Sequence, residues 1–79
     1  MLELSEKRKY ITTMYDLLSS IIAINDSGVY EAGITTTARD TEVMVTQTGR
    51  ISYRGILVFE SENFSETASI ILNNLKSYL

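Results

Sequence analysis

Acidic and amide side chains are concentrated in one short segment near the end of the sequence, ESENFSE at residues 60–66. The segment holds Glu60, Glu62, Asn63 and Glu66. Carboxylates at this density can bind a hard cation, transfer protons in catalysis or present negative charge to a basic partner. The segment lacks the regular spacing of oxygen ligands in a calcium loop, so we expect no metal site there.

The composition argues against an enzyme. The sequence contains no histidine and no cysteine, so it lacks the commonest general base, a thiolate nucleophile and the usual zinc ligands. Its four glycines stand apart and form no phosphate-binding loop, and no serine lies in a nucleophile elbow. We therefore expect a protein without enzymatic activity and without a cofactor.

Length and charge narrow the class of protein further. The 79 residues predict one domain over residues 1–79, a size at which a single core supplies only about 3–5 kcal/mol of net stability. Ten acidic and seven basic residues give a net charge of −3, the wrong sign for a general nucleic-acid binder. The first ten residues carry charges where a secretory signal is apolar, and no apolar run approaches the roughly 18 residues of a membrane span. We expect a cytoplasmic protein that does not interact with membranes.

Two segments have the apolar period of an amphipathic helix. The first covers residues 5–24, and its predicted core face consists of Ile11, Met14, Tyr15, Leu18, Ile21 and Ile22. The second starts after Asn63 and continues to the end of the chain, with a predicted apolar stripe of Phe64, Ala68, Ile71, Leu72 and Leu75.

Between the helices the apolar period changes to two. Three segments rich in Thr, Val, Ile and Tyr, over residues 28–37, 41–48 and 50–60, are separated by turn residues and predict strands. The sequence therefore predicts the α+β class, as a three-stranded antiparallel meander with two helices on one face, in the order α-β-β-β-α.

The turns set the expected strand register. A four-residue loop at 37–40 pairs Ile34 with Val43. A three-residue loop at 47–49, with Gly49 in the left-handed conformation, pairs Val45 with Ile51. A two-residue turn at this place sets apolar residues opposite polar ones, which favours the longer loop. The predicted apolar face holds Tyr30, Ala32, Ile34, Val43, Val45, Ile51, Tyr53, Leu57 and Phe59, and the same register places Glu42 opposite Arg54 as an ion pair.

Two explanations of the acidic segment stand side by side. Glu62 and Glu66 at a helix start complement the helix dipole, and Asn63 with Glu66 three residues later matches a capping box. Glu60, at the end of a strand, has no helix to stabilise, and residues 55–75 contain no basic side chain. Such a surface attracts lysine and arginine and repels phosphate. We interpret Glu66 mainly as a cap and Glu60 as a contact with a partner.

The predicted element order also occurs in double-stranded-RNA-binding domains, which is an alternative interpretation. Those domains direct lysines at phosphates from the start of their second helix, where this sequence has SENFSET. Only the basic run Lys7, Arg8 and Lys9 favours RNA. The charge distribution argues against direct nucleic-acid binding.

In its size, its acidity, its element order and the stretch ILVFESENFSETASIILNNL at residues 56–75, the chain resembles the small acidic phage anti-CRISPR proteins of type II-A, which inhibit the nuclease Cas9. The resemblance implies that acidic side chains at this junction imitate DNA phosphates and occupy the basic site where the nuclease reads the short motif beside its target. It assigns this role to Glu60, Glu62 and Glu66, with Asn63 as a polar neighbour.

The residues and the resemblance together predict a small non-enzymatic binding protein, encoded by a phage or mobile element, that inhibits a nucleic-acid-processing complex of its host. The expected partner is a host protein or ribonucleoprotein with a basic surface. A small homo-oligomeric structural protein is a further alternative. Met44, Ile56 and Val58 lie on the outer sheet face, and either packing of this face or pairing of the third strands can complete a small core between two copies. We therefore expect a homodimer in preference to a monomer.

Overall fold

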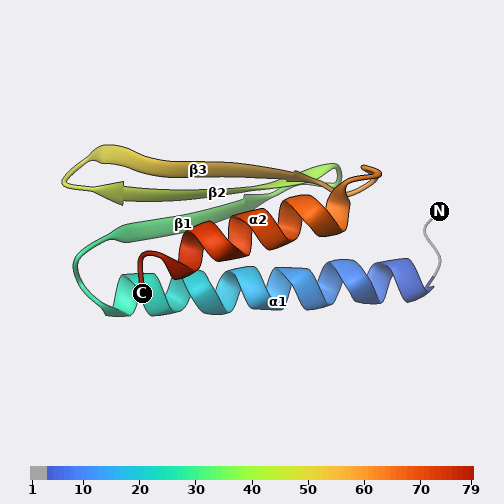
Figure 1. Ribbon diagram of the computed structural model, residues 1–79, viewed down its shortest axis with the longest axis horizontal. Helices are drawn as coiled ribbons and strands as arrows, with labels where there is room; N and C mark the ends of the chain where they lie inside the picture. Colours follow the sequence, from blue (N-terminus) through green and yellow to red (C-terminus); the bar gives the residue numbers. More distant parts are fainter. Residues whose placement is uncertain (1–3) are drawn as a thin grey trace.

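The computed structural model describes the backbone of residues 4–79 and the side chains of residues 7–79. Its elements are α1 (Leu4–Asp26), β1 (Glu31–Thr36), β2 (Asp40–Gln47), β3 (Arg50–Val58) and α2 (Phe64–Lys76). The strands form one antiparallel sheet in the order β1-β2-β3, and both helices pack against it (Figure 1). This arrangement confirms the predicted α+β class and the α-β-β-β-α order.

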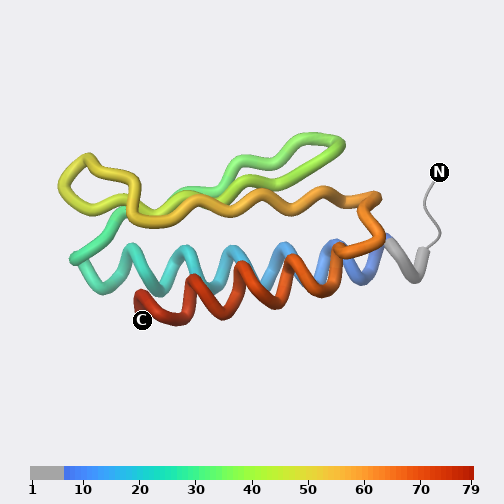
Figure 2. Tube along the Cα trace, turned by 45° about the horizontal axis from the view of Figure 1, so that its top comes forward, coloured from blue at the N-terminus to red at the C-terminus, as the bar shows by residue number. Residues whose placement is uncertain are grey.

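The helices form one layer and the sheet the other (Figure 1). In both views α2 runs beside α1 and in the same direction (Figures 1 and 2). As a result, the first turns of α1, the β1–β2 loop and the β3–α2 connection lie at the same end of the molecule, which measures 41 × 19 × 18 Å. Segments that are far apart in the sequence therefore meet at this end.

Both helices and the strands β2 and β3 contribute buried side chains to the core. The buried apolar side chains are Leu17, Ile21, Ile24, Val43, Val45, Leu57, Phe64, Ala68, Ile71 and Leu75. The predicted stripe of α2 is confirmed at its four buried positions, and Leu72 packs against them.

The predicted core face of α1 is wrong at four of its six positions. Leu17, Ile21 and Ile24 are buried, whereas the exposed side chains include Ile11, Tyr15, Leu18 and Ile22. The helix carries two apolar stripes, each with steps of three and four residues and offset from the other by one residue. Because both have the period of a helix face, periodicity cannot decide which one the sheet covers.

The first hairpin has the predicted register. Ile34 pairs with Val43 and Ala32 with Val45, across the four-residue loop at 37–40. Thr37 closes this loop, since its N–H donates to the carbonyl oxygen of Asp40 at 2.8 Å. The predicted pairing on this side of the sheet is confirmed.

The second hairpin corrects the prediction. Gln47 pairs with Arg50 across a two-residue turn, in which Thr48 has φ 49° and Gly49 has φ 81°. Positive φ at both central positions is the geometry of a type I′ turn, which follows the right-handed twist of the strands. The predicted left-handed Gly49 is confirmed, but the three-residue loop is wrong.

A β-bulge explains why the shorter turn is compatible with an apolar core. Thr46 pairs with Ile51 and Val45 with Tyr53, so that Ser52 is an extra residue in β3. The bulge brings Tyr53 and Leu57 onto the core face and leaves Ile51 62% exposed on the other. The predicted place of Ile51 in the core is therefore wrong.

The predicted ion pair of the outer face is present in a different register. Arg54 contacts Glu42 at 2.6 Å, although Glu42 pairs with Ile56 and Arg54 with Met44. The two charged residues are thus diagonal neighbours, which long side chains can bridge. The pair is partly exposed, and its contribution to stability is small.

We expect Gly49→Val to lower the free energy of unfolding by more than about 1 kcal/mol, because a β-branched residue resists the left-handed conformation that the turn requires. Urea unfolding monitored by circular dichroism measures this loss. Thr48→Gly is the matched control, since it relieves the other positive φ and should not lower stability by a comparable amount. An unchanged midpoint for Gly49→Val would contradict the turn assignment.

Candidate functional site

The acidic segment forms the connection between β3 and α2 and is anchored from two sides. The Phe59 N–H donates to the Arg39 carbonyl oxygen in the β1–β2 loop at 3.0 Å, and the Tyr10 hydroxyl of α1 donates to the Phe59 carbonyl oxygen. The rings of Phe59 and Phe64 lie 5.3 and 4.7 Å from that of Tyr10. The aromatic side chains thus fix the backbone of the segment and leave its polar side chains outside.

The structure brings the four predicted site residues together on this anchored connection. Glu60, Glu62, Asn63 and Glu66 are all exposed. Within residues 7–79, none of the three carboxylates accepts a hydrogen bond or joins an ion pair; the single ion pair there is the one between Arg54 and Glu42. Their charge is therefore available for contacts with another molecule.

The capping-box prediction is wrong for Asn63. The residue lies at the N-cap of α2, but its side chain makes no capping hydrogen bond, and its φ of −97° and ψ of 18° differ from the extended conformation of a capping residue. The Ser61 hydroxyl accepts from the Asn63 N–H instead, at 3.1 Å. A serine three residues before the first helical residue is a signal of this turn that the capping-box prediction did not use. Glu66 does lie in the first turn of α2, as predicted.

We expect Asn63→Ala to change the free energy of unfolding by less than about 0.5 kcal/mol, because no side-chain bond is lost. Ser61→Ala should lower it by about 0.5–1.5 kcal/mol, since it removes the hydroxyl that accepts from the turn. Ser65→Ala, an exposed position on the same turn, is the control for the loss of a hydroxyl. A loss of 1 kcal/mol or more for Asn63→Ala in chemical unfolding would restore the capping role.

Basic side chains border the acidic segment. The Lys9 ammonium lies 5.1 Å from the centre of the Phe64 ring, and Arg39 lines a shallow hollow together with Glu60. Lys7 and Arg8 project from other sides of α1, because successive helical residues are rotated by about 100°. The segment is thus an acidic patch with two cations at its margin, and the charges that the sequence separates are neighbours in space.

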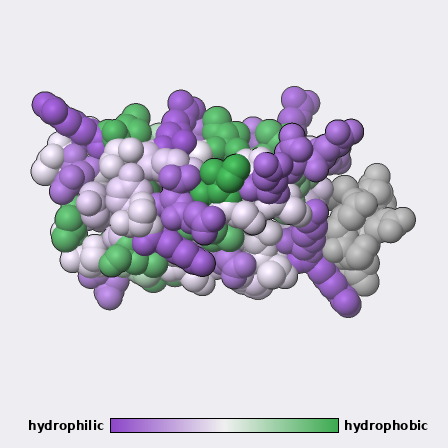
Figure 3. Space-filling model, viewed as in Figure 1, coloured by the Kyte–Doolittle hydropathy of each residue, from purple (hydrophilic) through white to green (hydrophobic). Residues whose placement is uncertain are grey.

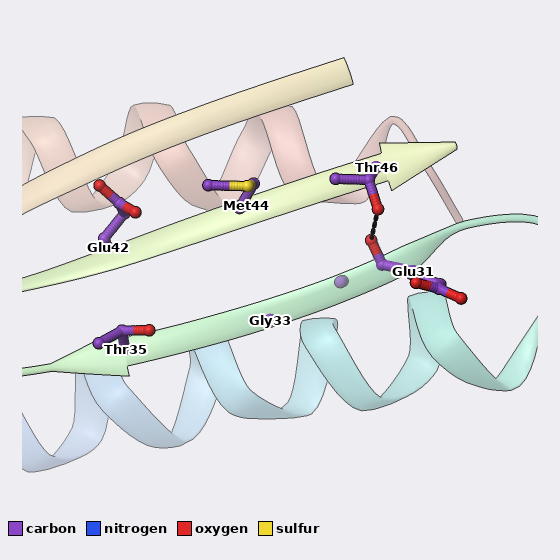
Figure 4. Close-up of a pocket in the computed structure, with 7 residues that line it drawn as sticks. Glu31, Gly33, Thr35, Glu42, Met44 and Thr46 are labelled. Atoms are coloured by element: carbon purple, nitrogen blue, oxygen red, sulfur yellow. Dashed lines mark hydrogen bonds between the residues drawn. The ribbon is translucent and has the colours of Figure 1, made fainter. Parts of the chain in front are cut away.

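A second hollow lies on the uncovered sheet face (Figure 4). It is lined by Glu31, Ala32, Gly33, Thr35, Glu42, Met44 and Thr46. Gly33 has no side chain there, and Figure 4 shows the carboxylates of Glu31 and Glu42 at opposite ends of the hollow. The Thr46 hydroxyl donates to the Glu31 carbonyl oxygen at 3.3 Å. Of the two carboxylates, that of Glu42 is held in the ion pair with Arg54.

Potential metal ligands and the surface hydropathy of the described residues bear on further sites. No group of three potential metal-ligating side chains occurs among the residues that the structure describes. On the face shown in Figure 3, apolar residues form separate spots among polar ones. Along residues 4–79 no helix has the length and apolarity needed to cross a membrane. Comparison with protein-family models, with curated proteins and with solved structures found no match for the chain.

Proposed function

We propose that the chain is a small non-enzymatic binding protein whose acidic segment, residues 60–66, contacts a basic surface of a host protein or ribonucleoprotein. One observation carries the proposal. Glu60, Glu62 and Asn63 are exposed on a backbone that aromatic contacts hold in place, and none of their side chains makes a hydrogen bond or an ion pair within residues 7–79. A rigid connection with unused polar side chains is suited to recognition, because little order has to be created on binding.

The charges indicate the chemistry of the partner. Carboxylates that are not paired within the fold attract lysine and arginine surfaces and increase the rate of encounter. Lys9 and Arg39 at the margin of the patch add positive charge beside it. This mixed pattern complements the surface of a folded protein, in which basic residues are also interspersed with acidic ones. A partner that carries only basic groups has no acidic side chains with which Lys9 and Arg39 can pair.

The resemblance to type II-A anti-CRISPR proteins suggests a specific target. In this proposal a phage or mobile element encodes the chain, and the protein acts in the host cytoplasm as an inhibitor of a Cas9–guide RNA complex. The acidic segment takes the place of the DNA phosphates at the site that reads the short motif beside the target. Arginine side chains of the nuclease read that motif. Carboxylates bind arginine through strong, often bidentate hydrogen bonds and can therefore compete with the DNA for these side chains.

A cleavage assay tests the proposed function. A type II-A Cas9–guide RNA complex is mixed with the protein before target DNA is added, and cut DNA is measured over time. We expect the protein to slow cleavage when added first and to act more weakly when the complex already holds DNA, because both occupy one site. Cleavage that is unchanged at a large molar excess of the protein would contradict the proposed target.

A further inference from the structure

The outer flank of α1 carries an apolar stripe that nothing in the described chain covers. It consists of Ile11, Tyr15, Leu18 and Ile22, which are 53%, 67%, 42% and 60% exposed. Three of these side chains line an apolar groove with Tyr10, Met14 and Ile34. Large exposed apolar side chains gathered in this way mark an interaction surface, whereas single ones are ordinary.

The spacing of this outer stripe is that of a helix–helix seam. Its members follow one another at steps of four, three and four residues, the alternation of the a and d positions of a coiled coil. The steps are the same when they are counted from either end. A second copy lying antiparallel therefore places Ile11 level with its Ile22 and Tyr15 level with its Leu18. Each apolar residue then meets an apolar residue.

Charge at the two ends of the stripe favours the same orientation. Arg8 and Asp26 lie eighteen residues apart, about five turns, so they project from the same side of α1. Asp26 is the last helical residue, where the negative end of the dipole disfavours an acid, and the last turn holds no basic residue. In an antiparallel pair each Arg8 lies level with Asp26 of the second copy, within about one residue rise. A parallel pair brings like charges together instead.

The free edge of β1, which lies beside α1, is protected against strand pairing, the other common route to a dimer. Asn25 donates through Nδ2 to the Ala32 carbonyl oxygen at 2.8 Å, and its Oδ1 accepts from the Ala32 N–H at 2.8 Å. The amide thus occupies the outward backbone groups of β1 at this residue. Because an added strand needs these groups, the structure disfavours sheet extension at the β1 edge, which lies beside the helix flank.

We propose that a second copy of this chain covers the outer stripe of α1, in an antiparallel, two-fold symmetric helix pair. The proposal is independent of the acidic segment and of its partner. It also differs from the dimer that the sequence suggests through Met44, Ile56 and Val58, which lie on the opposite, uncovered face of the sheet. A symmetric pair of this kind makes the same contacts twice, since Ile11 meets Ile22 in both halves.

Cross-linking tests the orientation, and the chain suits it because it contains no cysteine. Ile11→Cys and Ile22→Cys are prepared separately and then mixed under mild oxidation. We expect a disulfide-linked dimer in the mixture and little in either protein alone. Two copies of the same residue lie eleven residues apart along an antiparallel pair, about 16 Å, and a disulfide requires Cα atoms within about 7 Å. Ile70→Cys on α2, similarly exposed at 53%, is the control.

Charge exchange tests the pairing without disturbing the core. By sedimentation equilibrium we expect Arg8→Asp and Asp26→Arg each to weaken the dimer roughly threefold to tenfold. The double variant should recover the affinity, because the two charges are exchanged and still attract. Ile56→Glu, on the uncovered sheet face, should leave the dimer intact.

Three outcomes would overturn the proposal. The first is cross-linking of each cysteine variant alone, which indicates a parallel pair. The second is a protein that stays monomeric at millimolar concentration. The third is binding of the monomer to vesicles of phosphatidylcholine and phosphatidylserine, with loss of that binding in Ile22→Glu, which assigns the stripe to a lipid surface.

Discussion

Leu17→Ala is expected to lower the free energy of unfolding by about 2–5 kcal/mol, because it leaves a cavity among packed side chains. Leu17 is fully buried, at 0% exposure, and lies in the α1 face that contacts the core. A domain of this size has only about 3–5 kcal/mol of net stability. We therefore expect the melting temperature to fall by roughly 10 °C or more, or the cooperative transition to disappear.

The adjacent leucine supplies a matched control. Leu18 is 42% exposed and lies on the same helix, so Leu18→Ala removes the same atoms with a similar change in helix propensity. We expect it to cost less than about 1 kcal/mol when thermal unfolding is measured at low protein concentration, where self-association adds no stability. Equal losses for the two variants would contradict the assignment of the buried face of α1.

Gly55→Val is expected to lower the free energy of unfolding by about 1–3 kcal/mol, through overpacking. A Cβ atom at Gly55 would lie 2.8 Å from Tyr53 Oη and 3.0 Å from Ile71 Cγ1. The residue is buried in the middle of β3 and pairs with Val43 of the central strand β2. Burial also raises the pKa of the Tyr53 hydroxyl.

Gly33→Val is the control for the added side chain. Gly33 lies in β1 on the uncovered face, and a Cβ atom there would have no neighbour within 4 Å. Because valine favours strands, this change should leave the stability unchanged or raise it slightly. Chemical unfolding of both variants measures the difference. A Gly55→Val protein as stable as Gly33→Val would show that Tyr53 and Ile71 do not pack as described.

Local sequence patterns were sufficient to predict the order of elements and the first hairpin. The change of apolar period from helical to alternating separates the helices from the strands. At the first hairpin, Ile34 and Val43 admit one register that pairs apolar side chains, and no extra residue interrupts it. The burial of Phe64 and Ile71 in α2 follows from a helix that has a single apolar stripe.

Interactions that depend on the tertiary structure limited the rest of the prediction. The second hairpin combines a turn that is one residue shorter than predicted with a bulge at Ser52. Because the two changes together return Tyr53 and Leu57 to the core face, a register chosen by matching apolar residues cannot distinguish them from a longer loop without a bulge. On α1, Leu17 and Leu18 belong to different stripes, and only packing against the sheet decides which is buried. A second copy over the outer stripe would explain why both stripes are apolar.

The place of residues 60–66 between β3 and α2 was predicted from the sequence, but their local structure only in part. The exposure of Glu60 and Glu62 agrees with residues that follow a strand and precede a helix. The Asn63 cap was wrong because Ser61 forms the hydrogen bond of the turn. The proximity of Lys9 depends on the parallel course of α1 and α2, which has no local signature in the sequence.

The most direct test of the proposed recognition surface is the association rate of a charge-reversed variant. The rate of binding to the Cas9–guide RNA complex is measured for the wild type and for Glu60→Lys combined with Glu62→Lys, at low and high salt. Glu31→Lys, at an exposed position on the sheet, is the charge control. We expect the double variant to keep the wild-type melting temperature and to associate at least about tenfold more slowly at low salt, with a smaller difference at high salt. A double variant that associates with the complex as fast as the wild type would contradict the role of the acidic segment.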